Sequence, residues 1–164
     1  MSIATAVRSV ARLLKRLDRK VAFAESCTGG LVSGSLTKIP GISNYHCGGV
    51  VVYRNQTKQA YLGIAAELLE KPGPVSREVA EQMAQRVLHM TPEADLAASV
   101  TGHLGPNAPP KLDGLVFAAV AWRSQQRVRH RRLQCGRRDS RATRQRWVVE
   151  QVLLLLAAEL EAAR

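Results

Sequence analysis

A short apolar run near the start of the chain leads directly into a group of residues that could do chemistry. Residues 21–24 are apolar, Glu25 follows them, and Ser26 and Cys27 stand next to each other before the glycines at 29–30. In α/β proteins, binding and catalytic residues gather where a strand ends before a helix. This stretch is therefore a candidate site for a nucleophile.

Lys58 provides a candidate base for the serine. A serine hydroxyl is a weak nucleophile until a base removes its proton, and a lysine can be that base when burial or nearby positive charge lowers its pKa. Lys58 falls in the first turn of an expected helix, where the dipole disfavours an ammonium group. Tyr53 could relay a proton or orient the lysine, and N–H groups at the start of an expected helix over 28–38 could stabilise an oxyanion. These features allow a serine–lysine amidohydrolase, although Lys58 could instead be a surface lysine.

The other members of the set also have structural interpretations that the residues alone leave open. Ser26 and Thr28 could only cap a helix, and Tyr53 could be ordinary strand packing. Glu25 could orient a neighbouring group or point outward. We interpret Cys27 as a small buried residue and not as the nucleophile, because buried structural cysteine is the common case.

Strands alternating with helices predict one α/β domain over residues 1–164, with a mixed sheet covered on both faces. We expect strands over 21–25, 50–53, 95–100, 115–122 and 127–135, and helices over 3–17, 28–38, 57–62, 76–89 and 140–163. The strand over 50–53 is apolar throughout, which is typical of a strand buried on both sides, and Asn55 is the expected N-cap of the next helix.

Three of the expected strands end in unusual residues. Tyr53, Asn55 and Lys58 follow the second strand, and Thr101 and Gly102 follow the third, while Ser26 follows the first. Ends of neighbouring strands at the same sheet edge converge in space. We therefore expect one pocket built from these loops, beside a long loop over 102–113.

The positive charge of the chain is concentrated in one segment. The formal net charge is +11, and ten arginines lie between 123 and 146 with Asp139 as the only acidic residue there. Such a segment could bind nucleic acid, or it could be a solvated face with one or two anion-binding arginines. We favour the second interpretation and expect no nucleic-acid partner, because aromatic residues do not alternate with the arginines as a single-strand platform requires.

Composition also predicts the compartment. The three cysteines are odd in number and lack metal-type spacing, so we expect no disulfide and a reducing cytoplasm. No apolar run is long enough to span a membrane, and the N-terminus lacks the apolar core of a signal peptide. We therefore expect a cytoplasmic protein with no membrane partner.

Longer motifs resemble a known family. AESCTGG at 24–30, the pattern YxNxxK at 53–58 and SVTGxxGP at 99–106 occur in this order, and GPVSREVAEQMA at 73–84 continues the match. Together they resemble the CinA C-terminal domain family (competence/damage-inducible proteins), which includes stand-alone nicotinamide-mononucleotide deamidases. The resemblance covers most of the chain.

The resemblance implies a three-layer α/β/α sandwich with a mixed central sheet and hydrolysis of nicotinamide mononucleotide to nicotinic acid mononucleotide and ammonia. It implies Ser26 as nucleophile, with Lys58 and Tyr53 as its activating partners. Implied substrate-binding residues are Thr28, Gly29, Gly30, Asn55, Thr101 and Gly102, with Arg138 as the phosphate ligand by alignment and Arg137 close behind. The implied partners are a small-molecule nucleotide substrate and further copies of the chain in a homo-oligomer, and no metal or organic cofactor is implied.

The loop over 103–113 departs from the family pattern. Family members have a glycine-rich stretch there, whereas this chain has His103 and the proline-containing pairs 105–106 and 109–110 in a shorter loop. The nucleophile and the lysine are unchanged, so the departure concerns the substrate. It motivates one alternative, a nucleotide-binding or regulatory paralogue without turnover, and His103 could be a new polar contact or an exposed loop residue.

Overall fold

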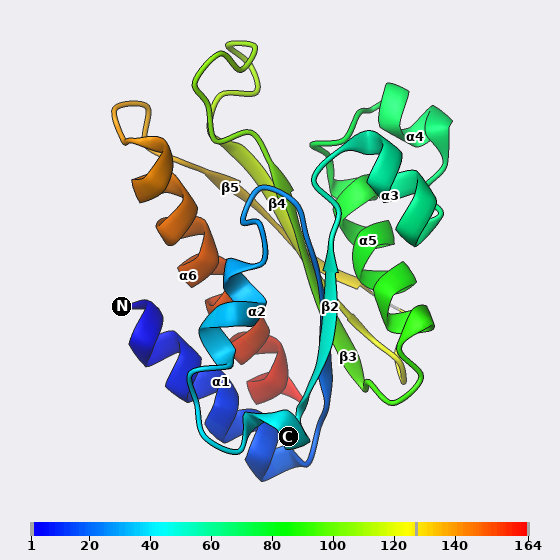
Figure 1. The fold of residues 1–164 in the computed structure, drawn as a ribbon, viewed down its shortest axis with the longest axis vertical. Helices are drawn as coiled ribbons and strands as arrows, with labels where there is room; N and C mark the ends of the chain where they lie inside the picture. The colour runs from blue at the N-terminus through cyan, green and yellow to red at the C-terminus, as the bar shows by residue number, and fades with distance from the viewer. Residues whose placement is uncertain (1, 127, 164) are drawn as a thin grey trace.

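A mixed five-stranded sheet forms the centre of the protein. The computed structural model describes residues 2–126 and 128–163. The strands are β1 (Val21–Glu25), β2 (His46–Val51), β3 (Leu96–Gly102), β4 (Leu115–Trp122) and β5 (Val128–Gln134), in the order β2-β1-β3-β4-β5. β1 is parallel to both β2 and β3, whereas β4 is antiparallel to β3 and β5. The predicted α/β fold class with a mixed sheet is confirmed (Figure 1).

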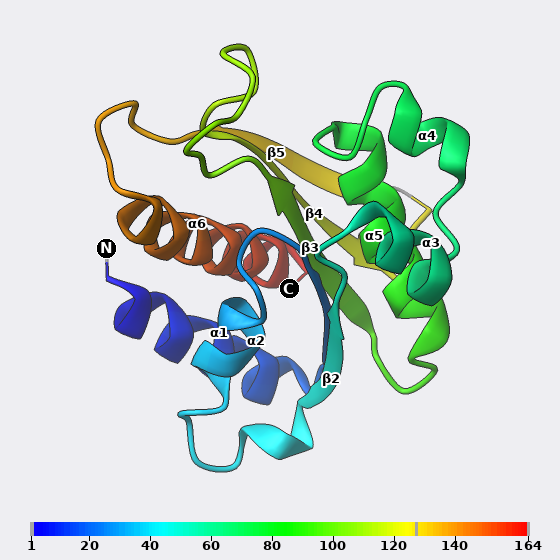
Figure 2. The ribbon, with the colours of Figure 1, turned by 45° about the horizontal axis from the view of Figure 1, so that its top comes forward.

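Helices cover both faces of the sheet and make three layers (Figures 1 and 2). One face carries α1 (Ile3–Leu17), α2 (Leu31–Leu36) and α6 (Arg141–Ala162), and the other carries α3 (Asn55–Leu62), α4 (Ala66–Glu70) and α5 (Arg77–Met90). β1 shows why two cores form. Because side chains alternate along a strand, Val21 and Phe23 join the core beneath α1 and α6, while Ala22 and Ala24 join the core beneath α5.

Serine side chains cap the starts of α5 and α6. The side chain of Ser76 accepts a hydrogen bond from the Val79 N–H, and that of Ser140 accepts one from the Thr143 N–H. Such bonds satisfy amide groups that have no partner within the helix. For α3 the expectation was wrong by one residue, because Arg54 is the N-cap and Asn55 is already helical.

Two expected elements differ from the structure. The second strand begins at His46, earlier than expected, and it is an edge strand with partly exposed residues, so the expectation of burial on both sides was wrong. The helix expected over 28–38 covers only Leu31–Leu36, because positive φ angles at Gly29 and Gly30 delay its start. The α4 helix was not predicted.

No helix within residues 2–126 and 128–163 combines the length and the apolar character needed to cross a membrane.

The packing of the buried face of α6 can be tested by shortening one of its side chains. Leu156 is fully buried, so Leu156→Ala should remove its packing and leave a cavity, lowering the free energy of unfolding by about 3 kcal/mol. Leu154 lies on the same helix and is only partly buried, so Leu154→Ala is the matched control with a smaller loss. Urea unfolding of both variants measures the difference in the free energy of unfolding. Equal losses of this free energy would contradict the assignment of Leu156 to the buried face of α6.

Candidate active site

The structure brings Ser26 and Lys58 together although 32 residues separate them in the sequence. Ser26 directly follows β1, and its N–H donates a hydrogen bond to the carbonyl of Val100 in β3. Lys58 lies on α3, and its Nζ is 3.0 Å from Ser26 Oγ and 3.0 Å from the carbonyl oxygen of Val52. Both side chains are buried. The arrangement joins a hydroxyl directly to an amine, which is the geometry that nucleophile activation requires.

Burial changes the acid–base behaviour of this lysine. Lys58 is only 2 % exposed, and desolvation lowers its pKa to about 8, with a smaller opposing effect from Cys27. Among the described residues, no carboxylate forms an ion pair with the ammonium form of Lys58. A neutral Nζ has a lone pair that can accept the Ser26 proton, so a pKa of about 8 makes Lys58 a usable general base near physiological pH.

Cys27 is not placed to compete with Ser26. It is buried, and desolvation together with nearby Cys135 raises the pKa of the Cys27 thiol to about 12. Because only the thiolate is an effective nucleophile, Cys27 stays a neutral thiol at physiological pH.

Glu25 holds the turn that carries the serine. Its buried carboxylate accepts hydrogen bonds from the Thr28 hydroxyl at 2.6 Å and from the backbone N–H groups of Gly30, Val32 and Ser33 at 3.0, 3.1 and 2.7 Å. These N–H groups belong to the start of α2. These three N–H groups are therefore bonded to Glu25 and are not available to an oxyanion.

Two amide groups next to Ser26 donate no hydrogen bond to another residue of the described chain. They are the backbone N–H groups of Cys27 and Thr28, for which no other residue within 2–126 and 128–163 is an acceptor. The residue after a nucleophile commonly supplies one oxyanion donor in hydrolases. Thr28 is fully buried, so the N–H of Cys27 is the better candidate donor beside Ser26.

Ser26 and Lys58 line a hollow of about 360 Å³ at the carboxyl ends of β1 and β3. Its other predicted members are Tyr53, Asn55, Thr101 and Gly102. His103, which the sequence left open as either a polar contact or an exposed loop residue, also lines the hollow. Residues that sequence reasoning did not assign to the site complete the lining: Arg54, Gln56, Pro74 and Val75. The Thr101 hydroxyl donates a hydrogen bond of 2.8 Å to the Pro74 carbonyl and so ties β3 to the segment before α5.

Four predicted binding residues lie elsewhere. Thr28, Gly29, Gly30 and Arg138 do not line this hollow. Thr28 is fully buried against Glu25, and the Gly30 N–H is bonded to the same carboxylate. Arg138 is an exposed residue of the segment before α6. Their roles toward substrate stay predictions.

Arg141 reaches the rim of the hollow. Its guanidinium donates a hydrogen bond of 2.6 Å to the Tyr53 hydroxyl and another to the Gly105 carbonyl. Tyr53 is 54 % exposed, and its hydroxyl is hydrogen-bonded to Arg141 and not to Lys58. Arg141 was one of ten arginines in its segment, and no local pattern distinguished it.

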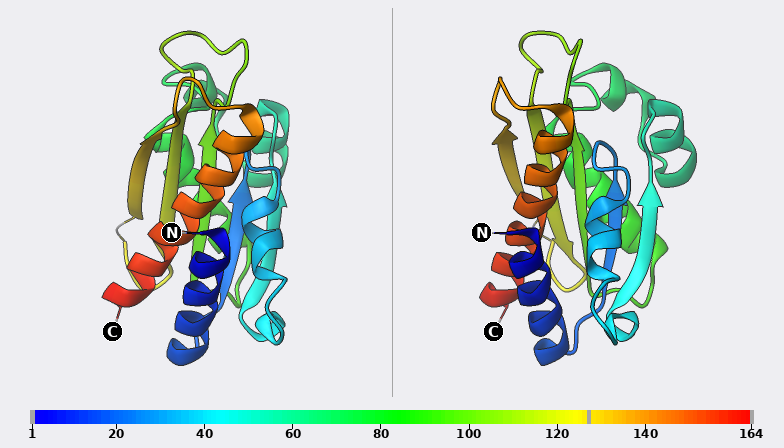
Figure 3. Two further views of the ribbon diagram at one scale, coloured as in Figure 1. Left: turned by 90° about the vertical axis from the view of Figure 1, so that its left-hand side faces the viewer. Right: turned by 60° about the vertical axis from the view of Figure 1, so that its left-hand side comes forward.

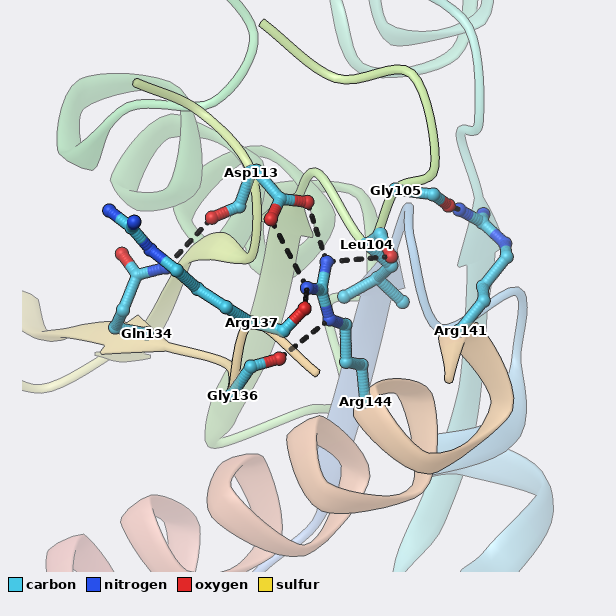
Figure 4. A network of polar contacts seen from close by, with 8 residues as sticks. All are labelled: Leu104, Gly105, Asp113, Gln134, Gly136, Arg137, Arg141 and Arg144. Atoms are coloured by element: carbon cyan, nitrogen blue, oxygen red, sulfur yellow. Dashed lines mark hydrogen bonds and ion pairs between the residues drawn. The ribbon is translucent and has the colours of Figure 1, made fainter. Parts of the chain in front are cut away.

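The unusual loop over 103–113 is held by a second arginine (Figure 4). Arg144 is buried and donates to both carboxylate oxygens of Asp113, at 2.6 and 3.1 Å. It also donates to the carbonyls of Leu104, Gly136 and Arg137. The bond from Arg144 lowers the pKa of Asp113. One side chain therefore fixes both ends of this loop and the segment before α6.

Several arginines of the basic segment are engaged within the protein. Arg123 donates to the carbonyls of Leu88, Thr91 and Ala94 at the end of α5, and Arg129 pairs with Glu159. Within the part of the chain that the structure describes, no cluster of three or more His, Cys, Asp or Glu side chains could hold a metal ion.

Comparison with known proteins identifies the family. The model of the CinA C-terminal domain matches residues 3–160. The chain belongs to this family. A putative competence-damage inducible protein of Caldicellulosiruptor saccharolyticus is 44% identical over 114 residues, which are 68% of this chain and 28% of that protein. A CinA-like protein of Geotalea daltonii is 43% identical over 122 residues, which are 73% of this chain and 29% of that protein. The chain thus spans less than a third of the length of these CinA relatives.

Solved CinA-family structures have the same fold. A competence/damage-inducible protein from Agrobacterium tumefaciens has a TM-score of 0.90 at 35% identity, covering 97% of this chain and 95% of that one. A competence damage-inducible protein from Klebsiella pneumoniae has a TM-score of 0.91 at 26% identity, covering 98% of both chains. The expected family and fold are confirmed by these matches.

The pKa of Lys58 has a measurable consequence for stability. Its pKa is about 8 in the folded protein and 10.5 when unperturbed, so the unfolded state binds more protons between these pH values. The free energy of unfolding should therefore rise with pH across this window, by about 3 kcal/mol for this group. Urea unfolding of the wild type and of Lys58→Met isolates the effect when it is measured from about pH 7.5 to about pH 10.5, a range that spans the two pKa values. Parallel pH dependences of the two proteins would contradict a lowered pKa.

Proposed function

We propose that the protein is an amidohydrolase that converts nicotinamide mononucleotide to nicotinic acid mononucleotide and ammonia. The observation that carries the proposal is the 3.0 Å contact between Lys58 Nζ and Ser26 Oγ in a buried site. Membership of the CinA C-terminal domain family supports it, together with the resemblance to the family's deamidases. We further propose that the protein is cytoplasmic and forms a homo-oligomer. Size-exclusion chromatography with light scattering measures the oligomeric state.

In the first half of the reaction, neutral Lys58 accepts the Ser26 hydroxyl proton as Oγ attacks the carboxamide carbon. The carbonyl oxygen becomes an oxyanion, and the N–H group of Cys27 stabilises it. Protonated Lys58 then gives its proton to the departing nitrogen, and the C–N bond breaks. Ammonia leaves, and the nicotinoyl group remains as an ester on Ser26.

The second half of the reaction uses the same lysine. Lys58, again neutral, takes a proton from a water molecule that attacks the ester carbonyl. The oxyanion collapses, and the proton returns from Lys58 to Ser26 Oγ. The released product is a carboxylic acid, so one amide bond is hydrolysed with no oxidant, reductant or cofactor.

Arg141 is our proposed phosphate ligand in place of Arg138. It already reaches the rim of the hollow through Tyr53, and a guanidinium can bind phosphate with two parallel hydrogen bonds. Tyr53 and Arg141 together would hold the end of the substrate that lies away from Ser26. In this proposal Tyr53 positions the nucleotide and acts on Lys58 only indirectly.

Loss of the nucleophile should abolish ammonia release. Ser26→Ala is expected to lower kcat by at least about 10³-fold, because no other group forms the ester. Lys58→Met should cause a similar loss, whereas Cys27→Ala should retain most activity because the thiol is not ionised. The wild-type kcat/KM should rise with pH and level off above about 8, the pKa of the free base.

The assay is ammonia release from nicotinamide mononucleotide, with circular dichroism to confirm folding of each variant. Full activity in Ser26→Ala would refute the assigned nucleophile. Calorimetric binding of nicotinamide mononucleotide by the wild type without any turnover would favour the nucleotide-binding paralogue.

The phosphate assignment separates two nearby arginines. Arg141→Ala should raise KM for nicotinamide mononucleotide by about tenfold or more, since a charge-assisted hydrogen bond to phosphate is lost. The same variant should leave the weaker activity on nicotinamide riboside, which lacks the phosphate, nearly unchanged. Arg138→Ala is the matched control and should have a small effect on both. A larger effect of Arg138→Ala would restore the alignment-based assignment.

A further inference from the structure

A long groove runs along the solvent side of the helical layer that contains α1, α2 and α6. Two hollows of about 600 and 520 Å³ form it, and both are lined by Arg8 and Ile39, so they adjoin. Figure 3 shows α1 beside α2 and α6 on this side of the sheet. The α1 residues that line the groove extend from Ile3 to Arg16, which is about 20 Å at the rise of an α-helix.

The floor of the groove is aliphatic. Leu31 is 45 % exposed there, and it is one of the few large apolar side chains with such exposure. Ile3 and Ile39 are partly buried beside it, and Val7 and Val149 close the bottom. An elongated apolar floor of this kind suits the apolar face of a helix more than a compact ligand.

Every charged side chain that lines the groove is a cation. These rim side chains are Arg8, Arg12, Lys15, Arg16, Lys38 and Arg146. Residues 3–17 and 31–45 contain no aspartate or glutamate. None of these six cations forms an ion pair with another residue of the described parts of the chain. The groove therefore has unneutralised positive charge along both sides of an apolar floor.

We propose that this groove docks an acidic amphipathic helix of a partner protein. The apolar face of that helix would cover Leu31 and Ile39, and its carboxylates would pair with the six rim cations. Charge complementarity selects this occupant. A second copy of the chain docked by the same face would bring like charges together, and nucleic acid would leave the aliphatic floor without stacking partners.

The groove is separate from the catalytic site. None of its lining residues lines the hollow around Ser26 and Lys58. Failure of the docking proposal would therefore leave the proposed activity untouched, and the reverse also holds.

A designed peptide tests the proposal on the full chain. The probe is a fluorescein-labelled helix of about 14 residues, the length that matches α1, with leucine on one face and glutamate elsewhere. Two control peptides keep the length: one replaces every glutamate by lysine, and the other scrambles the acidic sequence so that the leucines no longer share a face. Fluorescence anisotropy at two salt concentrations measures Kd for each.

Matched protein variants locate the binding surface. Arg8→Glu with Arg12→Glu reverses two rim charges, and Lys71→Glu with Arg86→Glu makes the same charge change at exposed positions outside the groove. Leu31→Ser tests the floor. Thermal unfolding confirms that each variant remains folded.

We expect the acidic amphipathic peptide to bind, and both groove variants to weaken Kd at least about tenfold, a free-energy loss of about 1.4 kcal/mol. The Lys71/Arg86 variant and Ser26→Ala should bind like the wild type, and added salt should weaken binding. Equal binding of the scrambled peptide, tighter binding of a single-stranded DNA of similar charge, or no binding below about 1 mM would each overturn the proposal.

Discussion

The buried carboxylate of Glu25 is the constraint on which the candidate site depends. A buried charge is costly unless hydrogen bonds replace its hydration, and Glu25 obtains four of them from Thr28 and the start of α2. The positive end of a helix also favours an anion at this position. The same bonds close the turn that begins with Ser26. The position of Ser26 therefore depends on hydrogen bonds to Glu25 in which Ser26 itself takes no part. They also use up the amides that would otherwise attract an anionic substrate.

Lys58 is also a buried ionisable group, but its charged form is compensated less well than that of Glu25. Backbone amides and a hydroxyl compensate the buried Glu25, whereas within residues 2–126 and 128–163 the Lys58 ammonium has only a carbonyl and a hydroxyl as hydrogen-bond partners. Desolvation therefore lowers the Lys58 pKa and makes the neutral amine available. One of these two buried ionisable groups thus holds the turn, and the other places an amine of lowered pKa beside the Ser26 hydroxyl.

Local patterns predicted the elements that have a clear period or cap. The α1, α5 and α6 helices and β1 and β4 lie close to their expected positions, because apolar spacing and serine caps are local properties. The convergence of Ser26 with Lys58 followed from the rule that strand ends meet at one edge of a sheet. The contact of Arg141 with Tyr53 could not be found in this way, because 88 residues separate the two and nothing local distinguished this arginine. Likewise, the edge position of β2 depends on the order of the strands in the sheet. The apolar composition of this strand does not reveal that order and instead indicated burial on both sides.

The first turns of α6 connect the parts of the site that come from distant segments. Arg141 holds Tyr53, Arg144 holds the loop over 103–113 through Asp113, and Gln145 donates a hydrogen bond to the carbonyl of Cys27 beside the nucleophile. This helix start explains how the loop can depart from the family's glycine-rich pattern without disturbing the catalytic pair. The loop shape depends on the Arg144–Asp113 ion pair, whereas Ser26 and Lys58 depend on Glu25 and on α3. The loop and the Ser26–Lys58 contact are therefore held by different residues.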